Sequence, residues 1–119
     1  MKRFLMVTML LISSTLFADV WEVSQVKINH VQAGVDGIFY ITIDGDIPET
    51  VGCAQEWGRR NWVGFVIRSG NESQKYIMSM ALAAQINNVF VDIGGYENEC
   101  INGTTPAAKL GYIRVGNYR

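Results

Sequence analysis

Hydrophobic and polar residues alternate along five short segments of this chain, and a longer segment between the third and the fourth follows another pattern. Alternation with a period of two predicts β-strands whose faces meet different surroundings. The five segments are Val20–Asn29, Ile38–Asp44, Trp62–Arg68, Val89–Ile93 and Leu110–Val115. The longer segment, Asn71–Asn88, reads NESQKYIMSMALAAQINN and predicts a helix. The pattern therefore predicts three strands, one helix and two further strands.

The helix prediction rests on the ends of this segment and on its composition. Asn71 is a suitable N-cap, with Gln74 three residues later as in a capping box. Alanine, leucine and methionine favour helices and fill the middle, and Asn88 tolerates the left-handed conformation that ends a helix. Apolar residues occupy more than one side, which is typical of a helix buried on more than one side. Two interpretations stay open: the helix covers a sheet, or one of its faces also meets another subunit.

Within the strands, the alternation assigns side chains to an inner and an outer face. The phase changes near Ser24–Gln25, which predicts a β-bulge, and Gly34–Gly37 supplies the residues of a hairpin turn. The residues expected to face the core in the second to fourth strands are Phe39, Ile41, Ile43, Val63, Phe65, Ile67, Val89, Val91 and Ile93. Phe90 and Asp92 are expected to face outward.

The order of these elements predicts a mainly β fold with one α-helix. Strand–strand–strand–helix–strand–strand, with a bulged first strand, is the order of the OB fold, a five-stranded Greek-key barrel with its helix after the third strand. Such a barrel also removes the exposed strand edges of a small sheet. The alternative is an α+β sheet with one covering helix.

The first 18 residues have the pattern of a secretory signal peptide. Lys2 and Arg3 precede a nearly continuous apolar run, and Met1–Ala18 ends in a small residue. The run is shorter than the ~20 residues of a membrane span, so an uncleaved anchor is the less favoured alternative. Cleavage after Ala18 leaves residues 19–119 as a single domain of 101 residues. We therefore expect a secreted or periplasmic protein with no stable membrane insertion.

Charge and cysteine content narrow the class of partner. Without the signal peptide the chain has eight basic and eleven acidic residues, and no basic run, which disfavours nucleic acid. The two cysteines, Cys53 and Cys100, lie in the two longest loops, and an even pair in an exported chain predicts a disulfide. Closing the 47-position span would stabilise the fold by about 4 kcal/mol on the chain-entropy model.

The residues of common catalytic and metal sites are missing. His30 is the only histidine, so no transition-metal site is expected. Asp44-Gly45-Asp46 resembles the start of a calcium loop, but the position where an EF-hand has its last acid is Gln55. Glu97 and Glu99 could form a glycosidase pair, yet nothing in the sequence indicates that either is buried. We expect no enzyme, no metal and no cofactor.

A binding surface is the remaining kind of site. If the inner residues fill a barrel, then Tyr40, Thr42, Trp62 and Arg68 lie outside on the second and third strands, the face that OB folds use for oligonucleotides or oligosaccharides. The two loops that a disulfide would join contribute Trp57, Arg59, Arg60 and Tyr96. Aromatic rings stack on sugars, and arginine pairs with carboxylates of the sialic type. The alternative is that Trp57 and Trp62 only cover the core.

Four stretches carry a resemblance to a known family: IFYITID at Ile38–Asp44, the Cys53…Cys100 pair, KYIMSMALAAQINN at Lys75–Asn88 and LGYIRVG at Leu110–Gly116. Together with the N-terminal segment, they resemble small exported OB-fold proteins, the B subunits of bacterial toxins built from one A and five B subunits, in particular the subtilase-cytotoxin and pertussis-like group. The resemblance implies a pentamer whose helices line a central pore, and glycan receptors on host cells. It carries over no sugar-binding residue.

Two functions from different classes follow. The first is a non-enzymatic glycan-binding module, similar to a toxin B subunit, that forms a homo-oligomer through Asn71–Asn88. The resemblance implies that this oligomer is a pentamer. The second is a monomeric periplasmic OB-type protein with an envelope-stress role or an accessory, protein-binding role. The oligomeric mass and a test of glycan affinity distinguish the two.

Overall fold

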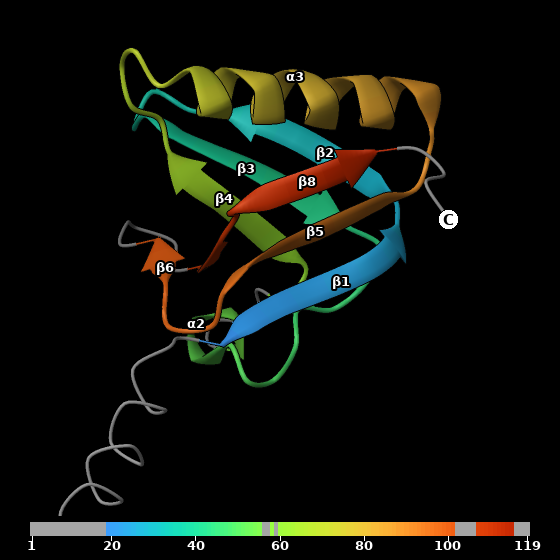
Figure 1. The fold of residues 1–119 in the computed structure, drawn as a ribbon, viewed down its shortest axis with the longest axis vertical. Coiled ribbons are helices and arrows are strands. Elements are labelled where there is room, and N and C mark those ends of the chain that lie inside the picture. Colours follow the sequence, from blue (N-terminus) through green and yellow to red (C-terminus); the bar gives the residue numbers. More distant parts are fainter. Residues whose placement is uncertain (1–18, 56–57, 59, 102–106, 116–119) are drawn as a thin grey trace, which may run out of the picture.

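The computed structural model of the chain describes residues 19–55, 58, 60–101 and 107–115. Within these ranges the protein is mainly β, with two sheets and two helices (Figure 1). The first sheet contains β1 (Val20–Val26), β5 (Val91–Tyr96) and β8 (Tyr112–Val115), in the order β1-β5-β8. The second has the order β2-β3-β4-β7-β6, with β2 (Ile28–Ala33), β3 (Ile38–Ile43), β4 (Trp62–Val66), β7 (Ala107–Lys109) and β6 (Cys100–Ile101). The mainly β prediction is confirmed in this form.

Neighbouring strands are antiparallel except β4 and β7, which are parallel. Only Lys27 separates β1 from β2, and only two residues, Leu110 and Gly111, separate β7 from β8. Each sheet therefore continues into the other at two places. The long helix α3 (Glu72–Asn87) packs on β2 and β8, one strand from each sheet.

The helix begins and ends where its capping residues predict. The side chain of Asn71 accepts a hydrogen bond from the Gln74 backbone N–H at 3.1 Å. Asn88 adopts the left-handed conformation at the C-cap, with φ 55°. A second helix, α2 (Gly52–Gln55), is a single turn inside the segment predicted as a loop. Because one turn has no measurable periodicity, the sequence pattern does not reveal it.

The predicted bulge in the first strand is confirmed. The register of β1 against β5 shifts between Val23 and Val26, and Gln25 has φ 57°. The backbone N–H of Gln25 donates to Asp92 Oδ1 at 2.9 Å. The Asp92 side chain, which the alternation placed outside, is therefore buried, at 2% exposure, because it satisfies the backbone of the bulge.

The main core forms between the sheets and the helix. The expected inner residues of β3 and β4 are buried, and the rings of Phe39 and Phe65 lie 5.2 Å apart. Ala81 and Ala84 of α3 are buried against this core, whereas Ile67 is half-buried. The other large buried members are Trp21, Val26, Ile28, Ile41, Ile43, Ile47, Val51, Val63, Val91, Ile93, Leu110 and Ile113.

The last third of the chain differs from the prediction. Val89 and Phe90 are exposed and precede β5, which runs through Gly94 and Gly95 into the segment predicted as a loop. The ring of Tyr112 lies against Gly94, so a side chain at this position would collide with it. A β-carbon on Gly95 would collide with the Lys109 carbonyl oxygen, so Gly94 allows close packing of β5 against β8, and Gly95 against the end of β7.

Candidate functional site

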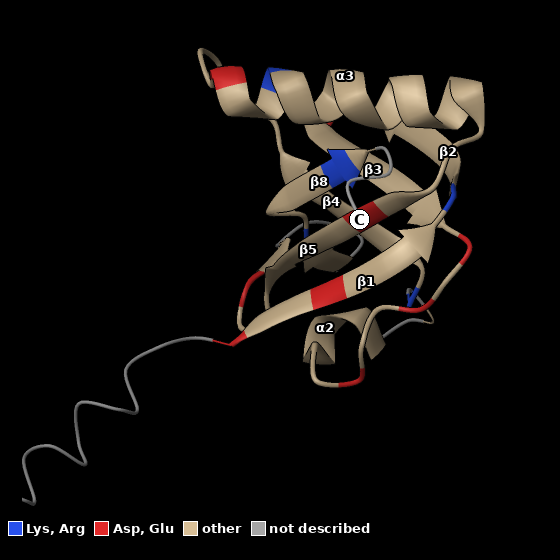
Figure 2. Cartoon of the chain, turned by 45° about the vertical axis from the view of Figure 1, so that its right-hand side comes forward, with Lys and Arg blue, Asp and Glu red and all other residues tan. Residues whose placement is uncertain are grey.

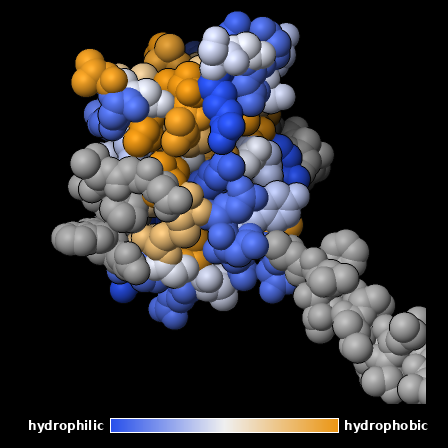
Figure 3. Space-filling model, turned by 90° about the vertical axis from the view of Figure 1, so that its left-hand side faces the viewer, coloured by the Kyte–Doolittle hydropathy of each residue, from blue (hydrophilic) through white to orange (hydrophobic). Residues whose placement is uncertain are grey.

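A pocket of about 500 Å³ opens where the end of β4, the first turn of α3 and β7 meet. It lies on the side of the molecule shown in Figure 3, where apolar and hydrophilic surfaces adjoin. Two predicted binding residues, Arg68 and Tyr96, line it together. The other lining residues are Val66, Asn71, Gln74, Glu99, Cys100, Ile101, Lys109, Leu110 and Gly111. We call this the Arg68–Tyr96 pocket.

One wall of the Arg68–Tyr96 pocket is fixed by Gln74. Its side-chain amide donates to the Val66 carbonyl at 2.8 Å, and its amide oxygen accepts from the Arg68 backbone N–H at 2.7 Å. Asn71 holds the backbone of Gln74 through the N-cap hydrogen bond. The first turn of α3 thus holds the backbone that carries Arg68, while the guanidinium stays exposed.

The opposite wall comes from the chain around β6. Lys109 Nζ lies 2.9 Å from Glu99 Oε2. Cys100 forms the predicted disulfide with Cys53, with Cα atoms 6.2 Å apart. This bond attaches β6 to α2, so the wall is covalently joined to the loop after β3. Tyr96 stands at the end of β5 with about half of its surface exposed.

The charges of the pocket favour an anionic ligand group. Glu99 offsets the charge of Lys109, whereas Arg68 forms no ion pair with another described residue. The lining residues contain two cations and one anion, a net charge of +1. A guanidinium presents several N–H donors in one plane, which suits two-point contact with a carboxylate. Tyr96 adds an aromatic side chain to the same lining.

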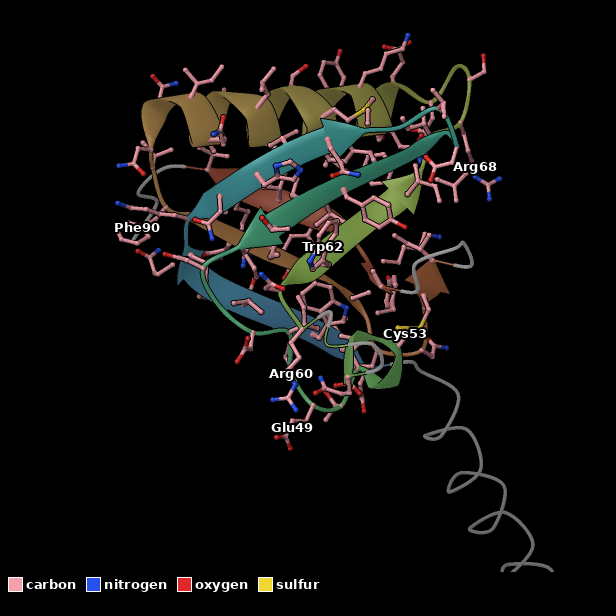
Figure 4. The ribbon with its side chains drawn as sticks, turned by 180° about the vertical axis from the view of Figure 1, so that it is seen from behind. Glu49, Cys53, Arg60, Trp62, Arg68 and Phe90 are labelled. Atoms are coloured by element: carbon pink, nitrogen blue, oxygen red, sulfur yellow. A yellow bond between two sulfur atoms is a disulfide. The ribbon has the colours of Figure 1, made fainter. Side chains whose placement is uncertain are left out.

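A second group of predicted residues lies on the outer face of β2, β3 and β4, with Trp62 near its centre (Figure 4). The rings of Tyr40 and His30 lie 5.6 Å and 6.4 Å from that of Trp62. His30 also bonds Gln32 at 2.8 Å. Trp62 itself is half-buried.

Tyr40 and Thr42 lie on the outer face, as the alternation predicts, but they are only 4% and 8% exposed. They are buried there because that face carries a second apolar cluster. Ile38, Tyr40, Ile101 and Ala107 form the cluster, with Trp62 packed against it. The covering residues come from β6 and β7, more than 50 positions later in the chain.

The remaining candidates are not brought into the pocket. Arg60 is exposed and lies at the opposite end of the β2–β3–β4 face from Arg68 (Figure 4). Trp57 and Arg59 lie outside the described residues. Sequence reasoning missed Gln74 and Lys109 as site residues, and it treated Glu99 as a solvated loop charge. These three residues reach the pocket through contacts between distant segments, and the sequence pattern does not predict such contacts.

Among the described residues, no group of three or more His, Cys, Asp or Glu side chains is arranged to hold a metal ion. No helix in those ranges is long and apolar enough to cross a membrane. The chain matches no model of a known protein family, and no curated protein matches it.

Proposed function

We propose that this protein is an exported, non-enzymatic binding module that recognises glycans with a carboxylate, and that the Arg68–Tyr96 pocket is its site. The observation that carries the proposal is the position of Arg68, whose backbone is fixed by Gln74 and whose guanidinium is the excess positive charge of the pocket. An arginine can pair with the carboxylate of an acidic sugar, and an aromatic side chain in the same pocket can stack on the apolar face of the sugar. The mixed polar and apolar lining also fits a sugar ring.

The strand pairings support an OB-type barrel as the scaffold of this site. If β1 and β2 count as one bulged strand, and β7 and β8 as another, the pairings run through five strands and return to the first. α3 then follows the third strand, as in the OB order. In that arrangement the pocket lies beside the third and fifth strands, near the face that OB folds use for ligands.

The disulfide supports export. Such bonds persist in oxidising compartments, so Cys53–Cys100 is compatible with a location outside the cytosol. Together with the signal-like residues 1–18, it favours a secreted or periplasmic protein. Similarity to toxin B subunits would add host glycans as the natural ligands.

The test is calorimetric titration of the oxidised protein with the methyl glycoside of N-acetylneuraminic acid. We expect binding to the glycoside and at least tenfold weaker binding to its carboxyl methyl ester. Arg68→Gln removes the charged donor, and hydrogen bonds to charged groups contribute about 1.5–3 kcal/mol. The expected loss of affinity is therefore roughly 10- to 150-fold.

Arg60→Gln is the matched control, because it removes an exposed arginine at the other end of the β2–β3–β4 face. It should leave the affinity within about twofold. Equal losses in the two variants would mean that overall charge, and not the pocket, attracts the sugar. A protein that binds neither the glycoside nor other acidic sugars would support the accessory, protein-binding alternative.

A further inference from the structure

The outward face of α3 is apolar over most of its length. Ala81 and Ala84 turn toward the core, while Tyr76, Leu82 and Ile86 are 67%, 49% and 69% exposed. Met80, Ala83 and the polar Ser79 are exposed between them. We call this surface the α3 outer face. Phe90, just after the helix, is exposed below it, where Lys27 Nζ lies 5.0 Å from its ring, so it belongs to another surface (Figure 4).

The α3 outer face has no charge with which to select a charged partner. Glu72 and Lys75 pair with each other at 3.1 Å in the first turn. From Tyr76 to Phe90 the sequence contains no Asp, Glu, Lys, Arg or His, and the rest of the helix is uncharged in Figure 2. A helix that lies on a lipid surface has lysine or arginine along its polar side, which this one lacks. The best-matched occupant is another uncharged apolar helix.

The order of side chains along the helix makes the face complementary to itself. Met80 lies three residues before Ala83, and Ile86 lies three residues after it. If two copies cross antiparallel at Ala83, Met80 of each meets Ile86 of the other. The small Ala83 side chain allows the close approach of the helices, which pack 8–10 Å apart. Tyr76 of each copy then lies toward the C-terminal end of the other helix.

The exposed apolar area of the α3 outer face fits a reversible contact between two copies of the protein. With about 150–200 Å² for a fully exposed large side chain, Tyr76, Met80, Leu82 and Ile86 together expose roughly 400 Å². This lies within the range of the largest apolar patches on ordinary monomers. Two copies would bury about 800 Å² of it in total, which is the size of a weak, reversible contact.

We propose that two copies of this protein associate through their α3 outer faces, antiparallel, around a two-fold axis at Ala83. This inference does not depend on the glycan site. It also differs from the pore of helices implied by the resemblance to toxin B subunits, because a water-filled pore would face polar side chains, whereas this face suits a dry contact.

The test is sedimentation equilibrium of the oxidised protein, purified after export, over a range of concentrations. We expect the average mass to rise from one chain toward two. Ala83→Glu puts two carboxylates on the axis and should weaken association at least tenfold, with the folded far-ultraviolet spectrum unchanged because Ala83 is exposed. Ser73→Glu is the control, since Ser73 is exposed on the first turn, beyond the contact, and should leave association within about twofold.

Cross-linking tests the two-fold axis itself. Ala83→Cys should give a covalent dimer on mild oxidation, because the two sulfur atoms would lie across the axis. Ser73→Cys should not. A monomer at every accessible concentration, a ring of five subunits, or a dimer that Ala83→Glu leaves unchanged would each overturn the proposal.

Discussion

At the scale of single residues, Asp92 shows how one carboxylate stabilises the bend of a strand. Its Oδ1 accepts from the backbone N–H of Gln25, which has a positive φ, and its Oδ2 lies 3.8 Å from Arg114 Nε. Arg114 also pairs with Glu22, which accepts a hydrogen bond from the Tyr112 hydroxyl at 2.6 Å. A buried acid therefore connects the bulge of β1 to a polar network across β1, β5 and β8.

We predict that Asp92→Ala destabilises the protein by about 1–3 kcal/mol, because the part-buried hydrogen bond from the N–H of Gln25 to this buried carboxylate is lost. Urea unfolding, followed by the fluorescence of buried Trp21, measures the loss. Asp46→Ala is the control: Asp46 is exposed, and its removal should change the free energy of unfolding by less than about 0.5 kcal/mol. If both variants unfold at the same urea concentration, the role given to Asp92 is wrong.

At the scale of elements, the parallel pair β4 and β7 positions one wall of the pocket. Gly64 pairs with Tyr40 on one side and with Lys109 on the other. Its carbonyl accepts from the Leu110 N–H at 2.7 Å. A β-carbon on Gly64 would collide with the backbone carbonyl of Phe39, so the strands can approach only with glycine here.

Gly64→Ala should therefore destabilise the fold by at least about 2 kcal/mol, since backbone atoms must move to admit the methyl group. Gly52→Ala is the matched control, because a β-carbon on Gly52 meets open space in α2. It should leave stability unchanged or raise it by up to about 1 kcal/mol. Thermal unfolding of the two variants beside the parent decides the question, and a Gly64→Ala protein as stable as the parent would contradict this packing.

The elements that the sequence predicts well are those specified by neighbouring residues. The caps of α3 depend on Asn71, Gln74 and Asn88, which lie within or beside the helix, and the bulge appears as a change of phase within one strand. β6 and β7 have two and three residues, too few for a period to be recognised. Their position over β3 and β4 buries Tyr40, which no local pattern could indicate.

The candidate site was predictable only in part, for the same reason. Arg68 and Tyr96 were named from residue type, and the fold brings them to one pocket. The residues that complete the pocket around them, Gln74 and Lys109, come from the first turn of α3 and from β7. The residues that line the pocket are far apart in the sequence, and only the pairing of the strands brings them together.

At the scale of the whole molecule, the two sheets, α3 and the disulfide together build the pocket on one side of the protein. The Arg68–Tyr96 pocket takes residues from β4, the first turn of α3, the end of β5, β6 and β7. The Cys53–Cys100 bond holds β6 against α2. The α3 outer face lies on the helix side that faces away from the sheets, so the proposed dimer would leave the pocket open.

The most direct measurement is a titration of the isotopically labelled, oxidised protein with the sialic acid glycoside, followed by amide chemical shifts in NMR spectra. We expect the largest shifts on Arg68, Gln74, Tyr96, Lys109 and Gly111, which line the pocket. Their dependence on glycoside concentration should give one affinity, in agreement with calorimetry. Largest shifts around Trp62 and His30, or no shifts at all, would mean that this pocket does not bind acidic sugars.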